Sequence, residues 1–224
     1  LALQPFALKC SILFATASLS EAIEFTIAKA PVTIIADDKS SAQGETLTEL
    51  TYVISGNIKE GDTVIDVCGA PGGKALHAAS KTGKNGKVYV RDLTDYKVSL
   101  IEENLERAAY THVIPQVMDA TVLDSASIEK ADVVIADLPC SGLGIFNKKP
   151  DIKYNASEEG CRELAGLQRD ILSVCSDYVK KGGTLIYSTC TLNPEENINN
   201  ARWFAENFDF VQKDISDKIP ELLK

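Results

Sequence analysis

From residue 60 onward, short apolar runs alternate with stretches of helical periodicity, and this alternation restricts the fold more than any other feature of the chain. The runs are rich in Val and Ile and lie at residues 63–67, 87–90, 113–117, 132–137 and 184–188. Strands buried on both faces have such continuous apolar sequences, and strands that alternate with helices are typical of βαβ units. The sequence therefore predicts an α/β fold with a doubly wound, mostly parallel sheet.

The helical stretches carry start and stop signals. The stretch 159–181 ends in Lys-Lys before Gly182 and Gly183, which is a frequent helix stop. The stretch 194–208 begins with Pro194 followed by two glutamates, and both residue types suit a helix N-terminus. We expect helices in both places.

The first 58 residues fit this pattern less well. They are predicted to form an N-terminal extension with helical spacing and one strand, while residues 59–224 form the α/β domain. The apolar opening carries Lys9 as its only early positive charge, so we expect a helix packed on the domain rather than a signal peptide. No apolar run approaches the roughly 18–20 residues that a membrane span needs. No strong strand is expected after residue 208.

Cysteine usage and net charge limit the class of protein. The six cysteines are scattered without a CxxC pair, and with only His77 and His112 a zinc site is not expected. A chain of 224 residues rarely needs disulfides, so we expect reduced thiols and a cytoplasmic protein. The net charge of −9 argues against a surface that binds nucleic acid throughout, although it leaves room for one local basic groove.

A glycine-rich turn follows the first apolar run and opens a helix, at the place where doubly wound folds bind nucleotide ligands. A phosphate-binding P-loop would need glycine at Cys68 and Ser or Thr at Ala75, and the dinucleotide pattern Gly-x-Gly-x-x-Gly is also absent. A nucleoside-type ligand without pyrophosphate remains, and S-adenosylmethionine fits. The turn comprises Cys68, Gly69, Ala70, Pro71, Gly72, Gly73 and Lys74.

Two acidic residues follow the next two apolar runs. Asp92 lies 19 residues after Gly73, where a carboxylate can accept hydrogen bonds from ribose hydroxyls, and Asp119 could accept from an adenine amino group. An isolated aspartate after a strand is more often a turn or cap residue. Two of them behind a glycine turn favour contacts with the cofactor.

Cys140 and Cys190 each follow a predicted strand, in the segments DLPCSG and YSTCT. Because the two strands are expected to be neighbours about 4.8 Å apart, both thiols should lie at the carboxyl edge of the sheet, where catalysis usually occurs. Buried cysteines that fill space, or a redox disulfide, are the alternatives. The flanking Asp137, proline and hydroxyl residues favour a catalytic role.

Four motifs in this order, DVCGAPGGK, DLPCSGLG, KKPDIK and YSTCTLNPEEN, resemble those of the RNA cytosine-5 methyltransferases, and most of all the bacterial 16S rRNA enzymes of the Sun/Fmu type. The resemblance covers about residues 60–208. It implies a Rossmann-like class I methyltransferase fold that uses S-adenosylmethionine. It also implies that the catalytic domain lacks its last strand here, and that the extension is a possible remnant of an RNA-binding region.

The resemblance implies a role for each of the three residues. Cys190 would be the nucleophile that adds to carbon 6 of cytosine, which makes carbon 5 reactive towards a methyl group. Asp137 would hydrogen-bond ring nitrogen 3, and Cys140 would help remove the carbon-5 proton so that the adduct can eliminate. Lys74 would belong to the cofactor and base pocket, and Asp137 would also contact the cofactor.

A short basic run at Lys148, Lys149 and Lys153 is a candidate for contacts with RNA phosphates, although such runs are usually solvated surface. The expected partner is 16S rRNA, with tRNA as the alternative substrate, and the expected state is a monomer with no membrane association. An RNA 2′-O-methyltransferase and a non-catalytic RNA- or ribosome-binding scaffold are the rival interpretations.

Overall fold

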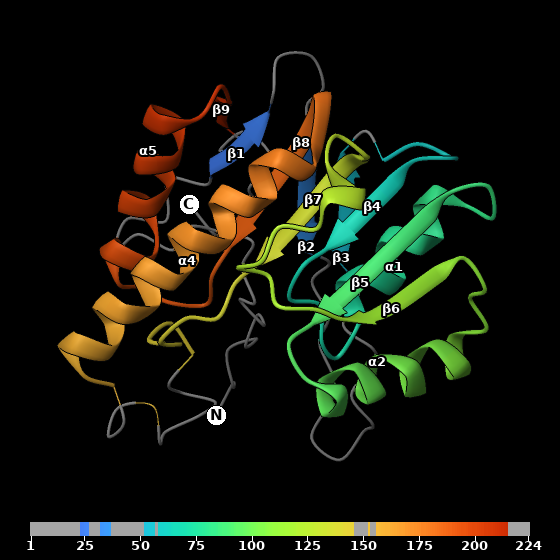
Figure 1. The fold of residues 1–224 in the computed structure, drawn as a ribbon, viewed down its shortest axis with the longest axis horizontal. Coiled ribbons are helices and arrows are strands. Elements are labelled where there is room, and N and C mark those ends of the chain that lie inside the picture. The colour runs from blue at the N-terminus through green and yellow to red at the C-terminus, as the bar shows by residue number, and fades with distance from the viewer. Residues whose placement is uncertain are drawn as a thin grey trace, which may run out of the picture.

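The computed structural model describes residues 58–145, 152 and 156–214, together with the strands at 23–26, 32–36 and 52–56. Its main sheet has seven strands in the order β6-β5-β4-β7-β8-β1-β9 (Figure 1). The strands are β4 (Thr63–Asp66), β5 (Lys87–Asp92), β6 (Val113–Val117), β7 (Ala131–Asp137), β8 (Val179–Ser188), β1 (Ile23–Thr26) and β9 (Val211–Asp214). A separate pair is formed by β2 (Val32–Ala36) and β3 (Tyr52–Gly56).

Strands β4 to β8 are mutually parallel, so their carboxyl ends meet at one edge of the sheet. Helices lie between them along the chain: α1 (Gly73–Thr82), α2 (Asp95–Ala108), α4 (Glu158–Tyr178) and α5 (Ile198–Asn207), with short 3-10 turns η1 (Ser125–Ser127) and η2 (Pro194–Glu196). This arrangement confirms the predicted α/β fold.

The two faces of the sheet have separate apolar cores. Ile65 and Val134 pack with residues of α4 and α5, whereas Val64 and Val133 pack with residues of α1 and α2. Successive residues of a strand point to opposite faces, so a strand that is buried on both sides must be apolar throughout. Helices therefore cover both faces of the sheet, with α4 running along β7 and β8 (Figure 1).

Strand β8 begins earlier than the sequence predicted. Helix α4 ends at Tyr178, and the Lys-Lys-Gly-Gly segment, predicted as the helix stop, belongs to the strand. Val179 pairs with Ala131 and Thr184 pairs with Val133, so the extra residues form an irregularity in the ladder. Tertiary contacts explain this earlier start of β8, since Val179 is buried and Lys180 forms an ion pair with Asp132 of β7.

Two further strands extend the sheet beyond β8. Strand β1 pairs antiparallel with both β8 and β9, so residues on each side of the predicted boundary at residue 58 share one sheet. No strong strand was expected after residue 208, and β9 is a four-residue strand that pairs, within the described part of the chain, with β1. One strand was expected before residue 58, and this was wrong, since three strands lie there. The helix expected in the opening residues lies outside the described residues, and the two-part division of the chain stays a prediction. No helix in the described part of the chain is long and apolar enough to cross a membrane.

Candidate active site

The glycine turn lies at the carboxyl end of β4 and is held against β5. The amide of Gly69 donates to the carbonyl of Arg91 at 2.8 Å, and a Cβ atom added to Gly69 would lie 2.4 Å from the Val90 side chain. Gly72 has a φ of 110°, in the left-handed region that favours glycine, and α1 begins at the next residue. The turn therefore fits only with its backbone pressed onto the neighbouring strand.

Asp66, the last residue of β4, is a buried carboxylate directly below this turn. It is fully buried, and neither of its carboxylate oxygens has a hydrogen-bond partner in the described part of the chain. Burial raises the pKa of Asp66 to about 7, against the opposing attraction of the Lys74 ammonium. The sequence analysis missed Asp66, and its signal was an acidic residue at the end of an otherwise apolar strand.

Asp92 lies at the end of β5 and supports the same turn. Its Oδ2 accepts from the amide of Ala70 at 3.1 Å, and its Oδ1 accepts from the amide of Leu93 and pairs with the ammonium of Lys97 at 2.9 Å. The Leu93 side chain beside it is 58% exposed, although it is apolar. The structure thus brings Asp92 to the glycine turn and leaves an apolar side chain exposed next to it.

Asp119 lies just beyond β6 and is exposed. Its Oδ1 accepts from both the amide and the hydroxyl of Thr121, and these hydrogen bonds lower the pKa of Asp119. The amide of Met118 donates to the carbonyl of Asp92, which joins the ends of the two strands. The contacts of Asp119 are those of a turn residue, and its contact with adenine stays a prediction.

The two cysteines meet at the carboxyl edge of β7 and β8, as their places after neighbouring strands predicted. The Sγ atoms of Cys140 and Cys190 are 3.1 Å apart, and the amide of Cys190 donates to the Sγ of Cys140 at 3.2 Å. The hydrogen bond with Cys190 and burial both raise the pKa of the Cys140 thiol above its ordinary value. Cys140 therefore keeps its proton in the free protein.

Asp137 lies between the glycine turn and the cysteines. It forms an ion pair with Lys74 in the first turn of α1, and the Ser188 hydroxyl donates to its Oδ1 at 2.7 Å. Both charged side chains of this pair are partly exposed. Lys74 and Asp137 thus connect the helix that follows the glycine turn with the strands that carry the thiols.

The other candidate residues lie apart from the thiols. Burial raises the pKa of Cys68 to about 12, so its thiol is a packing group of the turn rather than a reactive one. Cys175 is buried in the core, on α4. Lys148, Lys149 and Lys153, predicted to contact RNA, lie outside the described residues.

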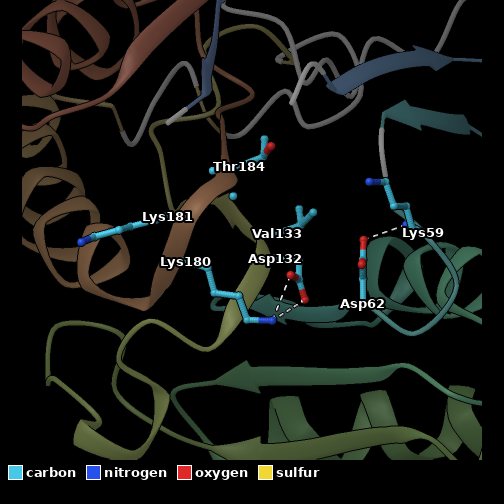
Figure 2. Close-up of a pocket in the computed structure, with 9 residues that line it drawn as sticks. Lys59, Asp62, Asp132, Val133, Lys180, Lys181 and Thr184 are labelled. Carbon is cyan, nitrogen blue, oxygen red and sulfur yellow. Dashed lines mark hydrogen bonds and ion pairs between the residues drawn. The ribbon is translucent and has the colours of Figure 1, made fainter. Parts of the chain in front are cut away.

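A polar pocket lies at the opposite edge of the sheet, around the amino ends of β4 and β7 and the first half of β8 (Figure 2). Lys180 pairs with Asp132 at 2.8 Å, and Asp62 accepts from the amide of Lys59 at 2.7 Å. The amide of Thr63 donates to the same Asp132 carboxylate. These contacts stabilise the start of the strands, and the pocket is remote from the cysteines.

The fold and the glycine turn at the carboxyl edge of the sheet define the class of protein. A mostly parallel sheet with helices on both faces and a glycine turn after β4 is the Rossmann-like fold of methyltransferases. The profile of the family described as 16S rRNA methyltransferase RsmB/F matches residues 53–216, and the chain belongs to this family.

Individual relatives agree with this assignment. The chain is 37% identical over 169 residues to the probable ribosomal RNA small subunit methyltransferase B of Bacillus subtilis, a match that covers 74% of this chain and 38% of that protein. It is 34% identical over 145 residues to the ribosomal RNA small subunit methyltransferase F of Escherichia coli O157:H7, covering 65% and 30%. The chain therefore spans well under half of the length of either relative.

A solved structure shows the same likeness. NSun6 from Pyrococcus horikoshii, determined with the S-adenosylmethionine analogue SFG, is 32% identical with a TM-score of 0.61. The match covers 66% of this chain and 38% of that one. The family resemblance inferred from the four motifs is thereby confirmed.

Proposed function

We propose that this chain transfers a methyl group from S-adenosylmethionine to carbon 5 of a cytosine in RNA, through a covalent bond between Cys190 and carbon 6. The observation that carries the proposal is the pair of thiols 3.1 Å apart beside Asp137, at the same sheet edge as the glycine turn. A 2′-O-methyltransferase would need no second thiol there. Membership of the RsmB/F family favours 16S rRNA over tRNA as the substrate.

The residues around the glycine turn fit S-adenosylmethionine, which supplies an electrophilic methyl group when bound. Asp66 is a buried carboxylate without a hydrogen-bond partner in the described part of the chain, and it suits the cationic ammonium of the methionine portion. Asp92 would accept hydrogen bonds from the ribose hydroxyls. The exposed Leu93 would cover the flat face of adenine.

The nucleophilic step belongs to Cys190. The Cys190 thiol gives its proton to water, and its thiolate adds to carbon 6 while the ring electrons move towards carbon 5. Carbon 5 would then take the methyl group, and the sulfonium of the cofactor would leave as a neutral thioether. Asp137, carrying a proton in the complex, donates a hydrogen bond to ring nitrogen 3 and stabilises the charge that develops on the ring. The ion pair with Lys74 and the Ser188 hydroxyl hold Asp137 in place until the base arrives.

The release step belongs to Cys140. In the free protein, the largest cause of the raised pKa of Cys140 is its hydrogen bond with the Cys190 thiol. Once the Cys190 sulfur is bonded to carbon 6, that thiol no longer ionises, and the pKa of Cys140 falls. Cys140 gives its own proton to water, and its thiolate then takes the proton from carbon 5. The electrons of that carbon–hydrogen bond re-form the double bond between carbons 5 and 6, and the carbon 6–sulfur bond breaks to release Cys190 as a thiolate. Bond formation by Cys190 thus allows Cys140 to act as the base.

The proposal is tested by incubating this chain with small-subunit rRNA and S-adenosylmethionine and measuring 5-methylcytosine by mass spectrometry of the digested RNA. We expect methylation that is lost in Cys190→Ala, because Cys190 is the group that forms the bond to carbon 6. Cofactor binding by the variant serves as the control for folding. Methylation elsewhere on the nucleotide, or methylation that survives in Cys190→Ala, would contradict the mechanism. That the chain acts as a cytoplasmic monomer stays a prediction.

A second prediction concerns the cofactor. Replacing Asp92 by Asn is expected to weaken the binding of S-adenosylmethionine by about 10- to 100-fold, because hydrogen bonds to a charged group contribute about 1.5–3 kcal/mol. Calorimetric titration measures the change. Asp95→Asn is the matched control, since Asp95 is an exposed residue of α2. Equal affinity of the two variants would remove Asp92 from the cofactor site.

A further inference from the structure

Two buried side chains hold the backbone on either side of Cys140. The Nε2 of Gln168 donates to the carbonyl of Pro139 at 2.8 Å, and the amide of Ser141 donates to the Oε2 of Glu196 at 2.7 Å. Both side chains belong to fully buried residues. The residue before the thiol and the residue after it are thus each fixed by one side chain from a distant part of the chain.

Gln168, on α4, has no freedom to turn its amide. Its Oε1 accepts from the Nδ2 of Asn200 at 2.9 Å and lies 2.9 Å from the Tyr187 hydroxyl. Asn200 is held in turn by Arg169, whose Nε donates to its Oδ1 at 2.7 Å. With its oxygen occupied on one side, Gln168 can only present its N–H group to Pro139.

Glu196, in η2, joins the loop of Cys140 to the segment that carries Cys190. Its Oε1 accepts from the Nδ2 of Asn193 at 2.9 Å, three residues after Cys190, while its Oε2 holds Ser141. Two more contacts join the same segments, since Ser141 Oγ and Thr191 Oγ1 are 2.8 Å apart and the amide of Gly144 donates to the carbonyl of Cys190 at 3.0 Å.

Packing alone does not account for this arrangement. Buried polar groups need hydrogen bonds to offset the loss of water, and apolar side chains of similar volume often stabilise a protein equally well. What a satisfied polar network adds is a fixed geometry. Here the network fixes the two peptide groups that flank one thiol.

We propose that Gln168 and Glu196 are positioning residues for Cys140, and that they set the rate at which the methylated base is released. This inference rests on the proposed function, in which Cys140 removes the carbon-5 proton. A general base displaced by about 1 Å can lose about 100-fold in rate. Both side chains contact the peptide groups adjacent to Cys140, whereas their contacts with the Cys190 segment lie three residues from that thiol, so the addition of Cys190 to the base depends less on them. Loss of either contact should therefore slow release more than addition.

The test uses Glu196→Gln and Gln168→Leu, each incubated with RNA and S-adenosylmethionine and analysed on a denaturing gel for the protein–RNA adduct. Glu196→Gln replaces one acceptor oxygen with an amide, and Glu195→Gln makes the same change at the neighbouring exposed residue. We expect the adduct to rise at least about tenfold in both buried variants and turnover to fall, while Glu195→Gln matches the wild type. Cys140→Ser is run beside them as the reference for blocked release.

The outcomes separate this inference from the proposed function. Turnover at the wild-type rate without adduct in both buried variants would overturn the positioning role. So would joint loss of adduct and turnover in variants that still bind the cofactor, or loss of cofactor binding in both, because the network would then support the whole fold. If Cys140→Ser itself forms no adduct while Cys190→Ala abolishes methylation, the assignment of Cys140 fails, and this inference fails with it.

Discussion

In the Cys140→Ser variant, we expect the protein to stay covalently bonded to its RNA instead of releasing the methylated product. Without the thiol, the carbon-5 proton has no base, and the bond between Cys190 and carbon 6 cannot eliminate. General base catalysis typically contributes about 10²–10⁴-fold, and we expect turnover to fall within that range. The adduct should survive denaturation, because it is a covalent carbon–sulfur bond. Gel shift of labelled RNA measures it directly.

Two controls give this experiment its meaning. The double variant Cys140→Ser with Cys190→Ala should show no adduct, since the nucleophile is gone. Cys175→Ala removes a thiol from the apolar core and should turn over without trapping RNA. Trapping by Cys175→Ala, or an adduct that persists without Cys190, would show that another group bonds to the base. The 3.1 Å separation of the two sulfurs would then have no catalytic meaning.

The sheet and its paired thiols could be predicted because they follow from local patterns. Each parallel strand is buried on both faces, so each reads as an apolar run, and the neighbouring places of β7 and β8 bring Cys140 and Cys190 together. The glycine turn could be predicted because Gly69 and Gly72 are required by contact and by backbone conformation. In these places the local sequence and the tertiary structure impose the same constraint.

The remaining features depend on partners that are distant in the sequence. Strand β1 pairs with β8 about 160 residues later, so no local pattern distinguishes it. Gln168 lies within a helical pattern and is fixed by contacts with Pro139 and Asn200, which lie 29 and 32 residues away. Lys180 was expected in a helix because of the helical spacing before Gly182, but it lies in β8, where it forms an ion pair with Asp132 of the neighbouring strand. Such features appear only when the chain is folded.

The buried carboxyl group of Asp66 is expected to make the free energy of unfolding depend on pH. Its folded-state pKa is about 7, against an ordinary value of 3.8, so folding favours the protonated form. The stability that this group contributes is therefore fully present below about pH 4 and is lost as the pH rises through about 7. A shift of this size corresponds to a loss of about 4 kcal/mol in the free energy of unfolding.

Asp66→Asn should remove this dependence, because the amide is neutral at every pH and keeps the shape of the protonated acid. We expect the variant to be more stable than the wild type at pH 8 by up to about 4 kcal/mol, and by much less at pH 5. Urea unfolding at the two pH values measures the difference. Asp177→Asn makes the same change at an exposed position of α4 and should show no such trend.

The cofactor connects this stability effect with function. A cationic ammonium beside Asp66 would favour the charged carboxylate, so affinity for S-adenosylmethionine should rise as the pH increases through about 7. Asp66→Asn should therefore bind the cofactor weakly at pH 8 even though its fold is more stable. A variant that gains stability and keeps full affinity would show that the buried charge serves no ligand. A variant that gains stability and loses affinity for the cofactor would show that the protein keeps this buried carboxylate in order to bind the cofactor.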